Sequence, residues 1–531
     1  MSVEKHIPNP YIEGFIRDIR TPGIRDPYIE QREDKAKQIM DHLADLRLEH
    51  EDLVTKFPQL DVNSNDQFAL TPFDDLVALE LMIPPEVHMR SWEIQREENL
   101  TIANHPARLF AMNELEQRGF VPPKKVRRPI GKNHRPIDRA RKNGEIINLS
   151  DLGQSRQLGL TRKEAKHPQV HRTPFLAVGP LSFMGDRVRS FVGVGAMSDI
   201  TGSVLAGVTL SKMHVLWHVP KDGIYSDPKK QVDFVSAVIS ELRNPNDPLL
   251  RFYTKEEREQ IIDRWISCMV VSTEADPDKA LRRFEGAFNV GARSVRPYQH
   301  TGGIEVIKTT GALKINFPDT EIFSSQISSE YIAQACEDAG ASAGILGVGS
   351  GGRCITAKMA ALIPTNAHLA WQLRGKLHRM PIMAEGGAIN NPVVSALVGM
   401  SGVLGSGSLG GGTFEAPGGM FFFSNDNGQT FLKPYRGEAS EAFKYLGGKS
   451  YPSGSPFFKE GDGTYRVFDP FVPSITSKIR NAWQSIIVGA SDLGLNGDDP
   501  DLIGQIHRLK RSPLERITQE GTKSQNTHPS S

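Results

Sequence analysis

From residue 190 onward, short runs of apolar and β-branched residues alternate with segments long enough to form helices. The runs lie at 191–197, 214–219, 266–272, 292–298, 321–326, 343–349, 381–386 and 402–407. Strands that alternate with helices are typical of parallel sheets, and eight repeats of the unit predict a TIM (β/α)₈ barrel. In this architecture the loops after the carboxyl ends of the strands build the active site.

The first 170 residues follow a different pattern, because they are charged and frequently interrupted by proline. Residues 28–57 carry apolar positions at helical spacing, which predicts a helix with one packing face. Nine of the nineteen residues at 124–142 are Lys or Arg. This segment is either a polyanion site or a linker that lies on an acidic surface, and the nearby prolines and the lack of interleaved aromatic residues favour the linker.

These patterns predict three parts of the chain. Residues 1–170 form an extension that is helical and irregular, residues 171–510 form the barrel, and the polar residues 511–531 form a disordered tail.

Composition excludes several classes of protein. The 63 Lys and Arg residues balance 62 Asp and Glu residues to a net charge of +1, so the whole molecule has no general attraction to nucleic acid or to a membrane. The three cysteines are too few and too scattered for a disulfide scaffold, and they suit a reducing compartment. No apolar run reaches the roughly 18 residues of a membrane-spanning helix. We therefore expect a soluble cytoplasmic protein with no membrane or nucleic-acid partner.

The segment GVGSGGRCIT at 347–356 contains the spacing GxGxxG at Gly347, Gly349 and Gly352. A dinucleotide-binding interpretation requires an acidic residue about 20 positions further on. No Asp or Glu occurs between residues 358 and 380, so this interpretation is weak. The glycines still permit backbone N–H groups to approach phosphate oxygens, and a second glycine-rich loop at 405–412 supplies the other half of a phosphate site.

Cys354 lies beside this predicted phosphate site, with Arg353 before it and Thr356 two residues after it. A neighbouring cation lowers the pKa of a thiol and makes it a better nucleophile. A buried, inert thiol is the alternative, and it is what we expect for Cys268 and Cys336 in their apolar surroundings.

Six segments in this order resemble the IMP dehydrogenase and GMP reductase family, over roughly residues 190 to 505. They read GAMSDITGS, GVGSGGRCIT, PIMAEGGAINN, GSGSLGGGTFEAPGG, KPYRGEAS and EGDGTYRV. The resemblance implies a purine ribonucleoside monophosphate substrate that a cysteine attacks at C2, with hydride exchanged between C2 and NAD or NADP, as in GMP biosynthesis. It also implies a homo-oligomer, a tetramer or an octamer.

The resemblance assigns roles position by position. Cys354 is the nucleophile, and Thr356 is the hydroxyl that handles water or ammonia. The implied substrate-binding residues are Met197, Ser350, Gly352, Glu385, Gly387, Gly407, Ser408, Tyr435, Glu438, Ala439 and Glu460. The implied cofactor-binding residues are Arg296, Gln326, Gly347 and Gly349. No catalytic metal is implied, and a monovalent cation such as K⁺ is expected near the Cys354 loop.

Several positions depart from the family pattern. Arg296 stands where the family has an aspartate that meets the cofactor ribose, which suggests either a phosphorylated cofactor or no cofactor. Glu385 replaces an aspartate that grips the substrate ribose, Gly352 replaces a serine, and Trp371 replaces the glutamate used by the reductases. The pair at 438–439 replaces a methionine and a glycine, and no arginine–tyrosine pair for water activation is found between residues 435 and 460.

Three functions stay open at this stage. The first is an oxidoreductase of the IMP dehydrogenase type, and the second is a GMP reductase-like or other purine-nucleotide enzyme on the same barrel. The third is a catalytically silent nucleotide-binding or assembly protein. Retention of Cys354 and Thr356 argues against the third, because a sensor needs the phosphate site but not the thiol.

Overall fold

The structure of the protein is a computed structural model. The structure describes residues 106–120, residues 179–347 apart from 248, 252 and 299–302, and residues 366–416 apart from 387, 388, 390, 391 and 414. It also describes the segments 421–423, 430–435, 465–468, 474–492 and 503–504.

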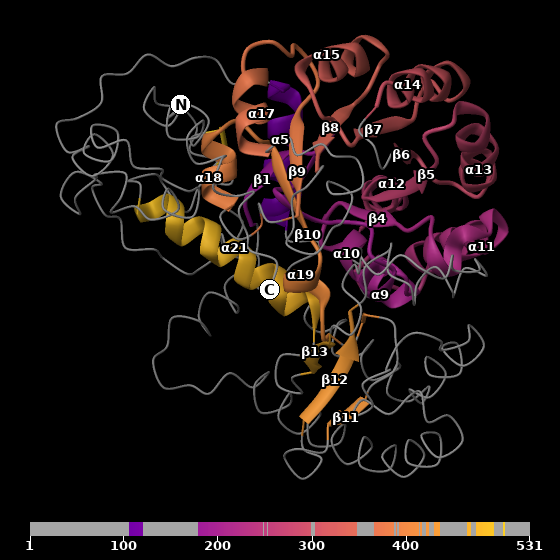
Figure 1. The fold of residues 1–531 in the computed structure, drawn as a ribbon. Helices are drawn as coiled ribbons and strands as arrows, with labels where there is room; N and C mark the ends of the chain where they lie inside the picture. The colour runs from indigo at the N-terminus through magenta and orange to yellow at the C-terminus, as the bar shows by residue number, and fades with distance from the viewer. Residues whose placement is uncertain are drawn as a thin grey trace.

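Eight parallel strands close into a barrel, as the sequence predicts (Figure 1). In order around the barrel they are β3 (Val192–Val194), β4 (Trp217–Val219), β5 (Met269–Thr273), β6 (Ser294–Pro297), β7 (Glu321–Ser325), β8 (Ala343–Leu346), β9 (Ile382–Glu385) and β10 (Gly402–Gly405). The last strand pairs with the first, with Val403 opposite Val192. The predicted TIM barrel is therefore confirmed.

Helices follow most of the strands and surround the barrel. They are α9 (Ser198–Thr201), α10 (Val204–Lys212), α11 (Pro228–Leu242), α12 (Lys255–Ser267), α13 (Pro277–Asn289), α14 (Glu305–Asn316), α15 (Glu330–Asp338), α17 (Asn366–Leu373), α18 (Pro392–Leu397), α19 (Gly407–Gly410) and α21 (Ile475–Asp492), with the short 3-10 helix η2 (Gly223–Ser226) before α11. None of the helices in the described ranges combines the length and the apolar character needed to cross a membrane.

Local capping chemistry fixes where several helices begin. Thr254 and Glu257 form a capping box at the start of α12, in which each side chain accepts the backbone N–H of the other residue. This helix continues through Ser267, because the helix face that carries Trp265 is buried in the core. The prediction that the third strand starts at residue 266 is therefore wrong, and the strand starts at Met269.

A hairpin closes the amino-terminal end of the barrel. Its strands are β1 (Leu181–Phe183) and β2 (Val188–Ser190), and its turn inserts Met184 among the barrel side chains. A Cβ atom on Gly402 would overlap the Met184 sulfur. The Met184 side chain therefore fits in the barrel only because residue 402, at the start of β10, is glycine. The apolar layer inside the barrel consists of Met184, Leu216, Val270, Phe323, Ala343, Ile345, Met383 and Leu404.

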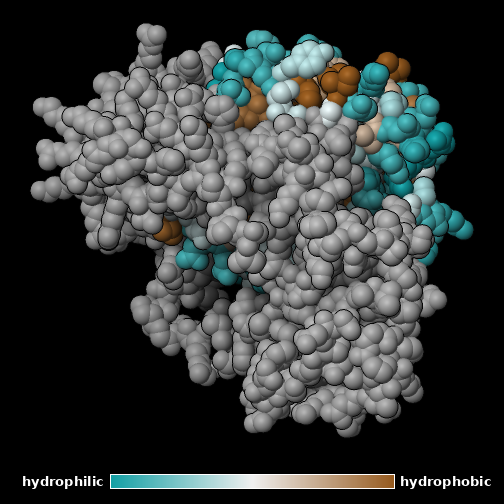
Figure 2. All heavy atoms as spheres, viewed as in Figure 1, coloured by the Kyte–Doolittle hydropathy of each residue, from teal (hydrophilic) through white to brown (hydrophobic). Residues whose placement is uncertain are grey.

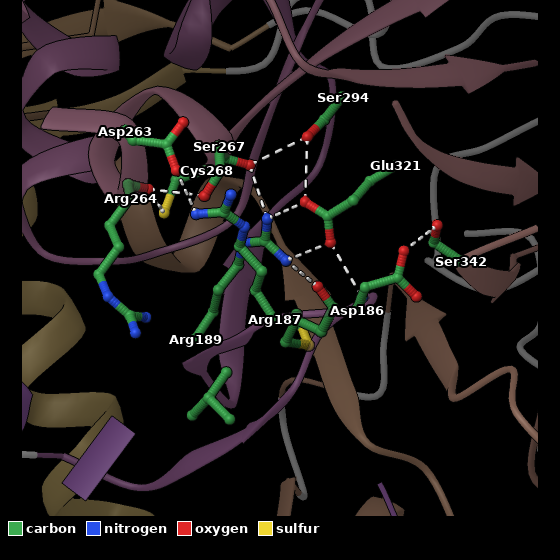
Figure 3. A network of polar contacts seen from close by, with 12 residues as sticks. Asp186, Arg187, Arg189, Asp263, Arg264, Ser267, Cys268, Ser294, Glu321 and Ser342 are labelled. Carbon is green, nitrogen blue, oxygen red and sulfur yellow. Dashed lines mark hydrogen bonds and ion pairs between the residues drawn. The ribbon is translucent and has the colours of Figure 1, made fainter. Parts of the chain in front are cut away.

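A buried ion pair between Arg189 and Glu321 anchors this hairpin (Figure 3). The Arg189 guanidinium also donates to the carbonyl oxygens of Met184 and of Ser267, the latter at 2.9 Å. Glu321 accepts the backbone N–H of Asp186 at 2.9 Å. Both charges thereby have hydrogen-bonding partners besides each other, which a buried ion pair needs to offset its desolvation.

Helix α5 (Pro106–Arg118) packs against the outside of the hairpin. The Arg108 guanidinium is buried, donates to the Met213 carbonyl at 2.6 Å and lies 4.6 Å from the centre of the Trp483 ring. Glu116 accepts from Arg264 at 2.8 Å. Part of the N-terminal extension is thus docked on the amino-terminal face of the barrel, whereas residues 28–57, 124–142 and 511–531 lie outside the described residues.

A three-stranded antiparallel sheet follows the barrel in sequence. Its strands are β11 (Phe421–Phe423), β12 (Thr430–Pro434) and β13 (Tyr465–Phe468), in that order across the sheet. On the face shown in Figure 2, the described outer residues are mainly hydrophilic, with scattered hydrophobic ones. The large exposed apolar side chains among the described residues are Phe110, Ile304, Ile315, Tyr331 and Val488.

Candidate active site

The carboxyl ends of the barrel strands bring most of the described site residues to one mouth. Arg296 lies on β6 and Glu385 ends β9. The others directly follow a strand or begin the short helix after one; they are Met197, Gln326, Gly347, Gly407 and Ser408. Tyr435 follows β12 and reaches this mouth from the three-stranded sheet.

Nine predicted site residues lie outside the described residues. They are Ser350, Gly349, Gly352, Cys354, Thr356, Gly387, Glu438, Ala439 and Glu460. The predicted nucleophile and the predicted cation loop stay predictions, whereas the predicted core positions of Cys268 and Cys336 are confirmed by their burial. Burial raises the pKa of Cys336 to about 11, so its thiol stays protonated.

An ion pair between Arg296 and Glu385 spans the mouth. The two guanidinium nitrogens Nη1 and Nη2 donate to the two carboxylate oxygens of Glu385 at 3.1 and 2.5 Å. Strands β6 and β9 are separated by two others in the barrel, so the pair joins nearly opposite walls. The Arg296 side chain is completely buried, whereas the Glu385 side chain is 22% exposed. Arginine therefore holds the carboxylate in a side chain that is only partly buried.

Neighbouring residues fix the orientation of the guanidinium. The Nε atom of Arg296 donates to Ser325 Oγ at 2.9 Å, and this hydroxyl donates to the Pro297 carbonyl at 3.1 Å. The Tyr298 ring lies 5.0 Å from the guanidinium carbon, and its hydroxyl accepts from Gln326 Nε2 at 2.9 Å. Three contacts of different chemistry thus hold Arg296 in one geometry.

The Glu385 carboxylate lies against two glycines that follow barrel strands, Gly195 and Gly347. A Cβ atom on Gly195 would fall 2.5 Å from Glu385 Oε1 and 3.2 Å from Ser406 Oγ. A Cβ atom on Gly347 would fall 3.4 Å from Glu385 Oε2. The carboxylate therefore lies between Gly347, which follows β8, and Gly195, which follows β3 and also faces Ser406 in the loop after β10.

Glu385 is ionised in this position. Burial raises the pKa of a carboxyl group, but the charge and the hydrogen bonds of Arg296, with a smaller effect of His218, hold the pKa of Glu385 below its usual range. The mouth consequently contains a carboxylate that accepts hydrogen bonds and cannot donate one.

His218 on β4 is a buried histidine near the Arg296–Glu385 pair. Its Nδ1 atom donates to the Val194 carbonyl at 3.0 Å, which leaves Nε2 as the unprotonated nitrogen. Among the described residues, Nε2 has no hydrogen-bond partner although His218 is completely buried. Burial and the Arg296 charge lower the pKa of His218 to about 3, so the ring is neutral at physiological pH.

The two predicted phosphate ligands Gly407 and Tyr435 meet in the structure. The Gly407 N–H donates to the Tyr435 hydroxyl at 3.1 Å, although the residues are 28 positions apart. Ser408 is exposed beside them. A backbone N–H, a phenol and an exposed serine hydroxyl thus lie at the carboxyl end of β10, where the last loops of many barrels bind phosphate.

The sequence of residues 297–528 matches the IMP dehydrogenase / GMP reductase domain. This part of the chain is similar to the IMP dehydrogenase / GMP reductase family. The match begins at the end of β6, and the structure shows that residues 192–297 supply the first four strands of the same barrel. The resemblance inferred from six motifs is therefore confirmed.

Individual relatives match shorter stretches. The inosine-5′-monophosphate dehydrogenase of Nitrosopumilus maritimus is 34% identical over 179 residues, which are 33% of this chain and 37% of that protein. Inosine-5′-monophosphate dehydrogenase 1 of Arabidopsis thaliana is 29% identical over 262 residues, 48% of this chain and 49% of that protein. The GMP reductase of Lactobacillus johnsonii is 35% identical over 146 residues, 26% of this chain and 42% of that protein. The chain thus spans less than half the length of these relatives.

Sequence reasoning missed two features of the barrel mouth. It singled out Arg296 and Glu385 separately but did not pair them, and it did not consider His218. The charge reversal at position 296 was a signal for the first, because a buried arginine requires an acidic partner. Nothing in the segment WHVP distinguishes His218 from an ordinary core histidine.

Proposed function

We propose that this chain is a purine-nucleotide oxidoreductase of the IMP dehydrogenase type. The observation that carries the proposal is the ionised Glu385 carboxylate, which lies against Gly347 at the start of the cysteine-bearing segment and against Gly195, a glycine that also faces Ser406 in the predicted phosphate-binding loop. A carboxylate in this place is suited to accept hydrogen bonds from the hydroxyl groups of a ribose, with the phosphate of the nucleotide on one side of the ribose and the base on the other.

Each described residue has a defined task in this proposal. The Gly407 N–H and the hydroxyl groups of Ser408 and Tyr435 bind the 5′-phosphate. Glu385 accepts the ribose hydroxyls, and Met197, which is half-buried at the start of α9, packs against the base. Together these contacts hold C2 of the purine at the loop after β8.

The predicted chemistry belongs to Cys354 and Thr356. The thiolate of Cys354 adds to C2 and forms a covalent bond to the purine, and loss of hydride from C2 leaves a thioimidate. Water oriented by Thr356 then adds to C2 and releases the thiol, which gives the oxidised purine. Substrate positioning by residues on other loops means that binding and chemistry are separable by mutation.

Among the described residues, we find a suitable partner for the carboxamide of a nicotinamide cofactor but none for its ribose. Gln326 Oε1 is buried and, within the described part of the chain, has no partner, so it suits the amide donor of a carboxamide group. The position that faces a cofactor ribose in the family is Arg296, whose charge is already neutralised by Glu385. Bound NAD or NADP would supply the hydride acceptor, and Gln326 would hold its carboxamide.

A GMP reductase-like reaction is the second candidate, and the arginine at position 296 favours it. The cofactor side has lost the acidic group that the family uses there, so a different second half-reaction is consistent with the mouth. A catalytically silent nucleotide-binding or assembly protein is the third candidate, and assembly as a tetramer or an octamer stays a prediction.

The first experiment is to follow absorbance at 340 nm with IMP and either NAD or NADP, for the full chain and for Cys354→Ala. We expect cofactor reduction that disappears in the variant, while IMP binding measured by calorimetry persists. Oxidation of NADPH with GMP in place of IMP turnover would establish the reductase alternative. Nucleotide binding with no turnover in either direction would support the silent protein.

A further inference from the structure

The two ends of the Gln326 amide differ in their contacts. The Nε2 atom donates to the Tyr298 hydroxyl at 2.9 Å. The Oε1 atom is buried and has no hydrogen-bond partner within the part of the chain that the structure describes. Because a buried carbonyl oxygen without a hydrogen bond is costly, an acceptor held in this state indicates a ligand group that donates to it.

We propose that Tyr298 is a positioning residue, which orients the Gln326 amide so that its carbonyl oxygen accepts a hydrogen bond from an uncharged carboxamide of the cofactor. This inference rests on the proposed function and names the residue that makes the site select an amide over a carboxylate. Tyr298 acts through Gln326 in this role and does not need to touch the ligand.

The Tyr298 side chain is itself held in place by three contacts. Its backbone N–H donates to the Thr273 carbonyl at 3.1 Å, which continues the pairing of β6 with β5 beyond the end of β6. The guanidinium carbon of Arg296 lies 5.0 Å from the centre of the Tyr298 ring, and Lys221 Nζ lies 5.4 Å from it. Cations attract an aromatic face at such distances, so the phenol is a restrained acceptor for the amide.

The backbone on both sides of Gln326 is also fixed. Ser325 ends β7 and contacts Arg296, and the Ile327 N–H donates to the Ile345 carbonyl on β8 at 2.9 Å. The oxygen and nitrogen ends of an amide have nearly the same shape, so hydrogen bonding decides which end faces which way. The Tyr298 hydroxyl binds the nitrogen end and thereby sets the direction of the oxygen.

The two cations beside Tyr298 offer no partner to a carboxylate. Arg296 is paired with Glu385, and Lys221 Nζ lies 2.7 Å from Asp222 Oδ2. A ligand carboxylate at Gln326 Oε1 would lose its hydration and would meet a second acceptor, whereas an amide N–H donates to this oxygen. The site should therefore distinguish nicotinamide from nicotinic acid, which differ only in this group.

The test compares NAD with its deamido counterpart, nicotinic acid adenine dinucleotide, or the corresponding NADP pair if the wild type binds NADP more tightly. Binding to the full chain is measured by calorimetry without IMP, so that no turnover occurs. For the wild type we expect the amide compound to bind about tenfold to a hundredfold more tightly. Binding of neither compound would overturn the proposed function together with this inference, whereas equal binding of both would overturn this inference alone.

Tyr298→Phe keeps the ring between its cations and removes only the hydroxyl. We expect the affinity for the amide compound to fall about threefold to tenfold. The preference over the carboxylate compound should shrink to less than about threefold, because the Gln326 amide can then turn its N–H groups to a carboxylate. A full wild-type preference in this variant would overturn the inference, as would an equal loss of affinity for both compounds, which is what a merely structural role predicts.

Two further variants complete the test. Tyr331→Phe is the matched control, because it removes a tyrosine hydroxyl from a side chain that is 68% exposed, and it should leave the preference unchanged. Gln326→Leu keeps the test decisive if Tyr298→Phe folds poorly, because leucine has a similar volume but no hydrogen-bonding group. We expect it to abolish the preference for the amide, and a retained preference would overturn the inference.

Discussion

The contact between Gly402 and Met184 gives a quantitative prediction about how the barrel is closed. A methyl group at position 402 would overlap the Met184 sulfur and would lie 3.3 Å from the Phe191 carbonyl oxygen. Since Met184 is completely buried in the apolar layer of the barrel, it has no free space into which to move. We expect Gly402→Ala to lower the free energy of unfolding by about 1–3 kcal/mol through overpacking.

Met184→Ala alone creates a cavity and should cost about 2–5 kcal/mol. In the double variant the methyl group at position 402 enters the space that the methionine leaves, so the two effects partly cancel. We therefore expect the double variant to be at least about 1 kcal/mol more stable than the sum of the single changes predicts. Additivity of the two changes within about 0.5 kcal/mol would refute the packing argument.

The assay is urea unfolding followed by circular dichroism. Refolding on dilution is the control, because large proteins often unfold irreversibly. Gly311→Ala is the matched control, because a methyl group there meets only the Ala339 Cβ atom at 4.0 Å and lies inside helix α14. That change should be neutral or should stabilise by up to about 1 kcal/mol. Nucleotide affinity should be unchanged in all four variants, since Gly402 begins β10 and the mouth lies at the other end.

Three further outcomes follow from the structure. Tyr435→Phe removes the hydroxyl that contacts the Gly407 N–H and should weaken nucleotide binding about tenfold in calorimetry, whereas its effect on kcat should be small. Arg189→Met should cost about 3–5 kcal/mol in urea unfolding, because it leaves Glu321 buried without its cation. His218 has a folded pKa of about 3 against an ordinary 6.5, so its contribution to stability is present above pH 6.5 and is lost as the pH falls toward 3. His218→Gln should reduce the pH dependence of the unfolding free energy in this window by up to about 1.4 kcal/mol per pH unit, and an unchanged slope would contradict the burial of a neutral ring.

The strands of the barrel could be predicted because each is a local pattern of apolar and β-branched residues. The predicted and observed strands overlap in all eight cases, and the errors lie at the ends. The hairpin β1–β2 escaped prediction for a physical reason. Its turn contains Asp186 and Arg187, and Arg189 lies on its second strand, so the segment looks exposed although Arg189 is buried.

The site could be predicted only as separate positions. Arg296 and Glu385 are 89 residues apart, and they come into contact only because the barrel closes. The buried Nε2 atom of His218, which has no partner among the described residues, is likewise a property of the folded structure and not of its segment. The sequence therefore contained the residues of the site, whereas their hydrogen bonds had to be obtained from the structure.

The barrel encloses an ion pair at each end, and the difference between the two pairs separates stability from function. At the amino-terminal end, Arg189 and Glu321 are 1% and 9% exposed, and the arginine also donates to two backbone carbonyls. At the mouth, Glu385 is 22% exposed while Arg296 is completely buried. A closed pair can be replaced by apolar residues of similar volume with little loss of stability. The pair at the mouth has no such substitute, because the Glu385 carboxylate is the group proposed to bind the ribose hydroxyls.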